Sequence, residues 1–113
     1  MKKSNRVYIK DILGSARQIV GYCRDYDYDK FANTKLVQDA VIRNLEIIGE
    51  AANKLTSDFR AKNPHLPIKE AIGMRNLLVH DYNYVNVEEV WKVVKEDLPV
   101  LIEQLESTKD SKY

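Results

Sequence analysis

The sequence predicts an all-α protein, built as an antiparallel bundle of four main helices with short connections. Apolar residues recur at helical spacing in four segments, and no segment alternates with period two for long enough to form a strand. Only four glycines and three prolines interrupt the 113 residues. At this length we expect residues 1–113 to form a single domain, with room for an extra short helix.

Composition narrows the classes of function. The formal net charge is +1, which argues against a broad electrostatic surface for nucleic acid, so any contact with RNA must be local and DNA binding is not expected. The single cysteine, Cys23, cannot form an internal disulfide and lies in an apolar register typical of a core residue. No run approaches the roughly 20 apolar residues of a membrane helix, and the polar start lacks a signal-peptide core. We therefore expect a cytoplasmic protein without a membrane partner.

The first helix is predicted from Ser4 or Asn5, either of which suits the N-cap, to about Arg24. One apolar stripe follows its length: Ile9, Ile12, Leu13, Ala16, Val20 and Cys23. The segment Asp25–Asp29 breaks the pattern and is expected to be a solvated loop whose tyrosines pack on the helix ends. Within it, Asp29 could cap a short turn that contains Phe31.

The second helix is predicted from about Thr34 to Leu55, and it is apolar over most of its circumference. Its main stripe is Val41, Leu45, Ile48, Ala52 and Leu55, flanked by Leu36, Ala40, Ile47 and Ala51 on one side and by Ile42 and Gly49 on the other. Such a helix is buried on more than one side, which predicts a second chain because a small bundle cannot surround it. The remaining polar strip is Asp39, Arg43, Glu46 and Glu50. It is either internal ion pairing, Arg43 with Glu46 or Glu50, or a support for a site.

The third helix follows a rigid connection, Asn63–Pro67, with Pro67 suited to the first helical position. His65, beside two prolines, is expected to be exposed rather than catalytic. The apolar side of this helix carries Ile68, Ala71, Ile72, Leu78 and Val79.

The fourth helix opens with a capping pattern, Asn86 at the N-cap and Glu89 three residues later. Its stripe is Val87, Val90, Trp91, Val94, Leu98, Leu101 and Leu105. Trp91 is therefore interpreted as a core residue. Pro99 removes a backbone donor, so we expect a kink there. From Glu106 onward the charged tail is expected to be frayed.

Functional side chains gather at the end of the third helix, where Arg75, Asn76, His80 and Tyr82 follow the spacing R-N-x-x-x-H-x-Y. Histidine suits proton transfer near neutral pH, and the fixed fork of an arginine matches a phosphate. The structural alternative is a capped helix end with a hydrogen-bonded histidine. On a straight helix Arg75 and His80 would point about 140° apart, whereas Asn76 and His80 share a face. Either the helix ends near His80, or the site combines groups from two chains across a two-fold axis.

The second arrangement suits RNA cleavage without a metal. One imidazole would remove a proton from a ribose 2′-hydroxyl, and the other would protonate the leaving 5′-oxygen. Arg75 would stabilise charge on the phosphoryl oxygens, and Asn76 would hold the histidine tautomer or bind phosphate. No zinc-binding pattern, Walker loop, dinucleotide fingerprint or nucleophile elbow is present, so no metal or cofactor is expected.

The chain resembles the HepT branch of the HEPN superfamily over nearly its whole length. The segments that carry the resemblance are Gln38–Ala51, Ile72–Met74, Arg75–Tyr82, Val90–Trp91 and Asp97–Pro99, in the order of the family. One departure is Ile68, where members often have a tryptophan after the proline. That difference concerns the packing of the third helix more than the site.

The resemblance implies a homodimeric helical toxin that acts as an RNA endonuclease in a type VII-like toxin–antitoxin pair. Its partner would be an MntA-type minimal nucleotidyltransferase, which neutralises the toxin by transferring AMP to the motif tyrosine. By position, Arg75 and His80 would be catalytic, Asn76 would assist, and Tyr82 would be modified. AMP on Tyr82 would place a bulky anion where the substrate phosphate should lie.

Two other interpretations stay open. One is a non-catalytic HEPN dimer that binds nucleotide or RNA, or that scaffolds a nucleotidyltransferase. The other is a helical interaction module in which the motif is only a helix terminus. The presence of Arg75, Asn76 and His80 together favours the enzyme.

Overall fold

The computed structural model describes residues 4–79 and 86–108, with the backbone alone for residues 76–79. The described chain is helical throughout and contains no strand, which confirms the predicted all-α class. In order the elements are α1 (Asn5–Cys23), α2 (Tyr28–Ala32), α3 (Lys35–Asn53), α4 (Ser57–Lys62), α5 (Ile68–Val79), α6 (Val87–Lys92), a π-helical turn η1 (Val93–Asp97) and α7 (Leu98–Glu106).

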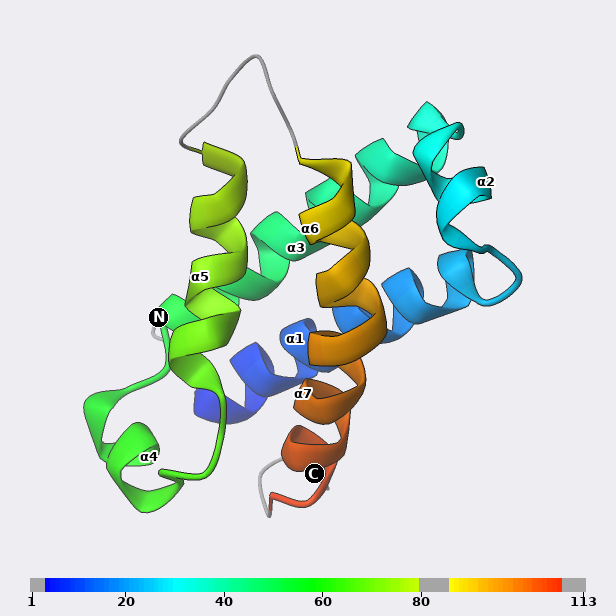
Figure 1. Ribbon diagram of the computed structural model, residues 1–113. Coiled ribbons are helices and arrows are strands. Elements are labelled where there is room, and N and C mark those ends of the chain that lie inside the picture. The colour runs from blue at the N-terminus through cyan, green and yellow to red at the C-terminus, as the bar shows by residue number, and fades with distance from the viewer. Residues whose placement is uncertain (1–3, 80–85, 109–113) are drawn as a thin grey trace.

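The bundle is built around the antiparallel pair α1 and α3 (Figure 1). Helix α5 packs on α3, and the continuous α6–η1–α7 helix packs on α1. The short α2 contacts both α3 and α6 at one corner of the bundle. Among the described residues, 24 hydrophobic side chains are buried between these helices, so burial of apolar side chains holds the arrangement together.

Helix α1 has the predicted bounds, with Ser4 at its N-cap. The predicted stripe is buried except at Val20, which is half-buried, and Ile19 is completely buried beside it. The start of the helix is fixed to the turn before α4, where the Asn5 side chain accepts from the Thr56 N–H and donates to its hydroxyl, both at 3.0 Å.

Helix α2 corrects the interpretation of the segment after α1. Tyr28 already belongs to a helix, and its N-cap is Asp27 rather than Asp29, because the Asp27 carboxylate accepts from the Lys30 N–H at 2.8 Å. An aspartate accepts best from the backbone two or three residues ahead, so a cap must stand before the first turn. Phe31 is fully buried, as its place in a short turn against the core requires.

Helix α3 begins after Thr34, as predicted, and its main apolar stripe is buried. Its carboxyl end is closed by Arg60 of α4, whose guanidinium donates to the carbonyls of Ala52 and Asn53 at 3.1 and 3.0 Å. A cation suits the negative end of a helix, so this contact fixes α4 to the end of α3.

Helices α4 and α5 form one arm of the bundle. Thr56 caps α4 by accepting from the Phe59 N–H at 3.1 Å. Helix α5 begins at Ile68, one residue later than predicted, and the Pro67 carbonyl accepts its first helical bond from Ala71 at 3.0 Å. His65 is exposed, as predicted.

The last helix contains a π-helical turn where a kink was predicted. Asn86 caps α6 as expected, accepting from the Glu89 N–H at 3.1 Å. In the π turn the Leu98 N–H donates to the Val93 carbonyl, five residues back. Proline lacks an N–H, and its ring clashes with the carbonyl four residues earlier. The wider turn directly before Pro99 accommodates both effects within a continuous helix.

The predicted tail starts later than Glu106 in the described chain. Glu106 ends α7 and forms an ion pair with Arg17 of α1 at 2.8 Å, and Thr108 is buried. Residues 109–113 lie outside the described residues.

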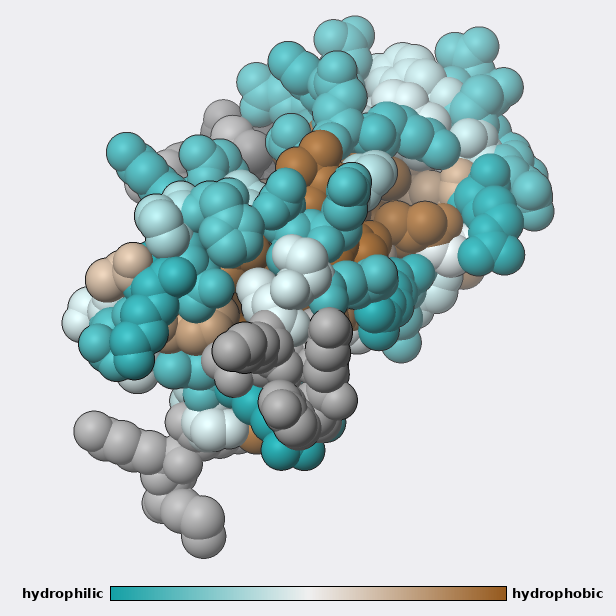
Figure 2. Space-filling model, turned by 90° about the horizontal axis from the view of Figure 1, so that it is seen from below, coloured by the Kyte–Doolittle hydropathy of each residue, from teal (hydrophilic) through white to brown (hydrophobic). Residues whose placement is uncertain are grey.

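Seen from below in Figure 2, the surface is mainly hydrophilic, and hydrophobic side chains show in the gaps between polar ones. Within the described ranges, no helix has both the length and the apolar character needed to cross a membrane.

Candidate functional site

The candidate site is anchored where α5 crosses α3, because Gly49 of α3 lies directly against Arg75 of α5. A Cβ added at Gly49 would lie 3.2 Å from the Arg75 backbone nitrogen and 3.3 Å from its Cα, and still closer to its Cβ. Only glycine permits this approach. The two helix backbones are therefore in close contact at the residue that opens the motif.

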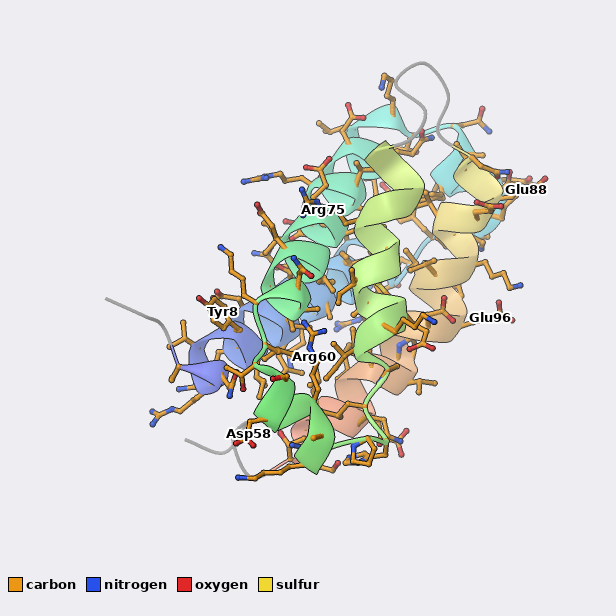
Figure 3. The ribbon with its side chains drawn as sticks, turned by 90° about the vertical axis from the view of Figure 1, so that its left-hand side faces the viewer. Tyr8, Asp58, Arg60, Arg75, Glu88 and Glu96 are labelled. Carbon is orange, nitrogen blue, oxygen red and sulfur yellow. The ribbon has the colours of Figure 1, made fainter. Side chains whose placement is uncertain are left out.

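Arg75 itself is exposed at this crossing, as Figure 3 shows. Its side chain forms no hydrogen bond or ion pair with any described residue. The backbone of Arg75 is thus fixed by packing while its guanidinium remains available. That combination suits an anion-binding group, since the donors need not break an internal pair before they meet a phosphate.

The predicted polar strip lies on the outer surface of α3. Arg43 pairs with Glu46 at 3.8 Å, one of the two pairings expected, and Lys35 pairs with Asp39 at 3.2 Å. Glu50 is exposed and follows Gly49 in the chain. Exposed pairs of this kind stabilise a fold by at most about 1 kcal/mol, so they set the local charge more than the stability.

Comparison with known proteins identifies the family of the chain that contains this crossing. The family model described as "Ribonuclease HepT-like" matches residues 12–108. The chain belongs to the HepT-like family. It is 43% identical over 105 residues to "Putative RNase MJ1380" of Methanocaldococcus jannaschii, which covers 93% of this chain and 96% of that protein.

Two further relatives agree. "Probable ribonuclease HepT" of Thermococcus cleftensis is 42% identical over 101 residues, 89% of this chain and 92% of that protein. "Putative RNase TTE0752" of Caldanaerobacter subterraneus is 33% identical over 103 residues, which cover 91% of this chain and 92% of that protein. No solved structure matches significantly.

The structure describes the other residues of the motif only in part. The backbone of Asn76 belongs to α5, and its side chain lies outside the described atoms. His80 and Tyr82 lie outside the described residues. The roles of Arg75, Asn76, His80 and Tyr82 therefore stay predictions, and Arg75 is the one whose side chain the structure places.

Sequence reasoning missed the function of Gly49. It treated Gly49 as one flank of a wide apolar face, whereas the structure uses it as the contact that seats Arg75. A small residue amid larger ones on a buried helix face was the available signal, since small residues allow close helix approach. The partner of such a contact cannot be found from spacing alone.

Two other candidate chemistries find no support within the described chain. The described residues contain no cluster of three or more histidine, cysteine, aspartate or glutamate side chains that could hold a metal ion. Cys23 is 1% exposed, and burial raises the pKa of its thiol, with a smaller opposing effect from Lys95. A buried, neutral thiol is a poor nucleophile, so Cys23 is a core residue.

Proposed function

We propose that this protein is a metal-independent RNA endonuclease and the toxin of a type VII-like toxin–antitoxin pair. The observation that carries the proposal is the exposed Arg75, which has no ion pair among the described residues and lies against Gly49 at the start of the R-N-x-x-x-H-x-Y motif. A cation carried on a backbone that packing fixes is suited to the stabilisation of phosphoryl charge. The names of the curated relatives, two of which contain RNase and one ribonuclease, support the same class of reaction.

The reaction proceeds by transfer of the phosphoryl group within the RNA. One His80 imidazole takes the proton of a 2′-hydroxyl, and that oxygen attacks the adjacent phosphorus. The bond from phosphorus to the 5′-oxygen breaks, and His80 of a second copy, as imidazolium, gives its proton to that oxygen. Arg75 stabilises the charge on the non-bridging oxygens, while Asn76 holds the imidazole or the phosphate.

Two copies of the chain form the active species in this proposal. Helix α3 supports it, because Leu36 is 81% exposed and Ala40 and Ile47 remain half-buried on its outer face. The α1 and α5 contacts cover the other faces of α3. A second copy would cover the apolar residues left over and bring two motifs together.

Regulation follows from Tyr82. An MntA-type minimal nucleotidyltransferase partner transfers AMP from ATP to the Tyr82 hydroxyl and releases pyrophosphate. The added phosphate blocks the position that the RNA phosphate occupies beside Arg75 and His80.

The nuclease proposal is tested with purified protein and single-stranded RNA in excess EDTA. We expect cleavage to continue and to leave a 2′,3′-cyclic phosphate or its hydrolysis product, identified by mass spectrometry of the fragments. Fragments with a 5′-phosphate, or loss of cleavage in EDTA, would show a different reaction. A protein that binds RNA and leaves it intact would favour the non-catalytic HEPN dimer.

The regulatory proposal has a separate test. Co-expression with a cognate MntA-type nucleotidyltransferase should add one or more AMP units to the intact mass and suppress cleavage. The gain should disappear in Tyr82→Phe and persist in Tyr84→Phe, a tyrosine two residues away that lies outside the motif. An unchanged mass in the wild type would leave complex formation as the means of inhibition.

A further inference from the structure

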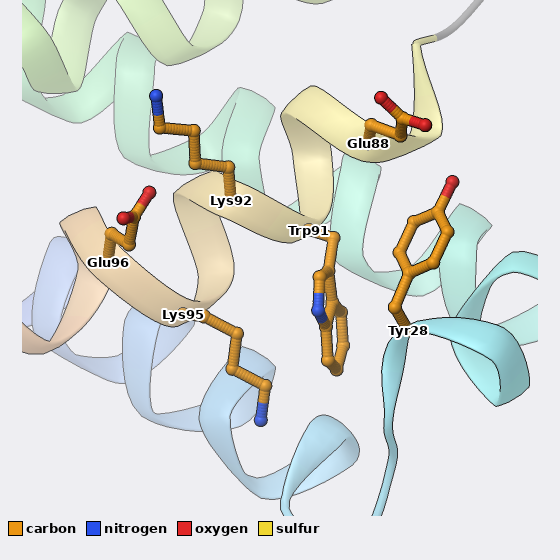
Figure 4. A pocket seen from close by; sticks show the side chains of 6 residues that line it. All are labelled: Tyr28, Glu88, Trp91, Lys92, Lys95 and Glu96. Carbon is orange, nitrogen blue, oxygen red and sulfur yellow. The ribbon is translucent and has the colours of Figure 1, made fainter.

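A hollow of about 480 Å³ lies at the corner where α2 meets α6. Six residues line it: Tyr28, Glu88, Trp91, Lys92, Lys95 and Glu96 (Figure 4). Tyr28 begins α2, whereas the other five follow one another along α6 and the π turn. Its volume is within the usual range for small-molecule sites, and its walls are mostly carbon.

Two aromatic rings form the main walls of the hollow. Figure 4 shows Tyr28 and Trp91 next to one another, projecting from different elements. Both side chains are half-buried, so part of each ring remains open. Trp91 is held from within by the buried Phe31, whose ring centroid lies 4.9 Å away at 33°. A fixed, half-open aromatic wall is suited to stacking, because little side-chain freedom is lost when a flat group binds.

The charged residues at the hollow provide groups for a polar ligand. Lys95 places its ammonium over the Trp91 ring, 4.6 Å from the centroid, so this flexible side chain must move aside toward a phosphate when a base stacks on that face. Lys92 stands four residues from both Glu88 and Glu96, yet the ion pairs of the described chain include neither combination. Two lysines and two glutamates cancel in net charge. Recognition here must therefore depend on the flat walls, with single cations and carboxylates to meet phosphate and amino groups.

The π turn explains why these residues meet. It adds one residue to a helical turn at Val93–Asp97 and so changes the direction of Lys95 and Glu96 relative to Trp91. Such turns within α-helices are frequent at functional sites. Here the turn accommodates Pro99 within the helix, and its residues Lys95 and Glu96 also form one side of the hollow.

We propose that this hollow is a remote subsite for single-stranded RNA, in which one base stacks against Tyr28 and Trp91 while Lys92 and Lys95 meet the neighbouring backbone phosphates. The inference rests on the proposed ribonuclease function and names how its substrate is held. Stacking on aromatic side chains accepts any base because every base has a π-face, and the two lysines provide cations beside the rings for the backbone.

The subsite is separate from Arg75. In Figure 3, Arg75 lies toward α3, whereas Glu88 and Glu96 project from the opposite side of α6 and the π turn. A strand that occupies both must therefore reach from the α3 side of α5 to the far side of α6. A group that contacts the substrate far from the reacting phosphate contributes to binding before and during the reaction alike, so its loss raises KM and leaves kcat unchanged.

Trp91 is the only tryptophan of the chain, so it reports on its own stacking. The full-length protein is titrated with a single-stranded oligoribonucleotide whose 2′-hydroxyls are methylated, which prevents cleavage. We expect a saturable change in tryptophan fluorescence. Tyr28→Ala and Tyr28→Leu should each weaken binding about tenfold, the loss of one base stack. The matched control is Tyr22→Ala, which removes an exposed tyrosine of α1 outside the hollow.

The outcomes separate the subsite from the nuclease. The subsite is wrong if fluorescence anisotropy of a labelled strand shows binding while the tryptophan fluorescence stays unchanged. It is also wrong if the Tyr28 variants bind the strand as tightly as Tyr22→Ala does. Both conclusions hold even when the wild-type protein cleaves RNA. If free AMP binds as tightly as the oligonucleotide, the hollow holds a mononucleotide and the proposal is overturned. Tyr28-dependent binding by a protein that never cleaves RNA would support the subsite and refute the nuclease.

Discussion

The α3–α5 crossing and the α2–α6 corner join helices in opposite ways. At the crossing, Gly49 lets two backbones touch, and the charged side chain of Arg75 lies at the surface with no hydrogen bond or ion pair to a described residue. At the corner, α2 and α6 meet through the rings of Phe31 and Trp91, and Tyr28 and Trp91 border an open hollow. The first arrangement fixes the position of one group, and the second leaves room for a ligand. Chemistry needs the former, and substrate binding needs the latter.

The largest expected effect comes from removing the group that the crossing positions. Arg75→Ala should lower kcat/KM for RNA cleavage at least about 100-fold, because it removes stabilisation of phosphoryl charge. Its melting temperature should change little, since the side chain is exposed and unpaired within the described chain. Arg24→Ala, an exposed arginine at the end of α1, is the control and should cleave normally. Equal activities in the two variants would place the active site elsewhere.

The next effect concerns the proposed second copy of the chain. Leu36→Glu introduces a charge on the exposed outer face of α3 and should convert the dimer to a monomer at micromolar concentration, with loss of cleavage. Light scattering gives the mass directly. Val100→Glu, which changes an apolar residue of α7 that is 50% exposed, should remain dimeric. A wild-type protein that is monomeric would remove the composite site from the account.

A smaller effect tests the backbone contact itself. Gly49→Ala should lower the free energy of unfolding by about 1–3 kcal/mol, because its methyl group would press on the Arg75 backbone. Gly14→Ala is the matched change, as a Cβ there meets nothing within 4 Å, and it should raise stability by about 0.5–1 kcal/mol. Urea denaturation measures both. If the two substitutions act alike, the crossing is looser than described and does not fix Arg75.

The sequence predicted the fold where the signal is local. The bounds of α1 and α3, the Asn86 cap and the all-α class follow from helical spacing and capping chemistry. The start of α2 was misplaced by the choice of Asp29 over Asp27, because both aspartates could cap a helix in this segment. The π turn was missed because a proline within a helix allows a kink or a wider turn, and neighbouring helices determine which one forms.

In the candidate site, too, the sequence predicted only the features that lie within one segment. Arg75 could be selected because its chemistry and its spacing are both readable in one segment. The Gly49 contact and the Tyr28–Trp91 hollow could not, since each joins residues far apart in the chain. Trp91 was predicted to be core, and the structure shows a half-buried ring that packs on Phe31 and borders the hollow.

The most direct test of the account measures kcat and KM for two variants in one cleavage assay. Arg75→Lys keeps the charge at the crossing and loses the fork of donors, whereas Tyr28→Ala removes one wall of the hollow. We predict that Arg75→Lys lowers kcat by at least about tenfold and that Tyr28→Ala raises KM about tenfold with kcat unchanged. A fall in kcat for Tyr28→Ala, together with normal kcat for Arg75→Lys, would contradict the separation of chemistry from binding on which the account depends.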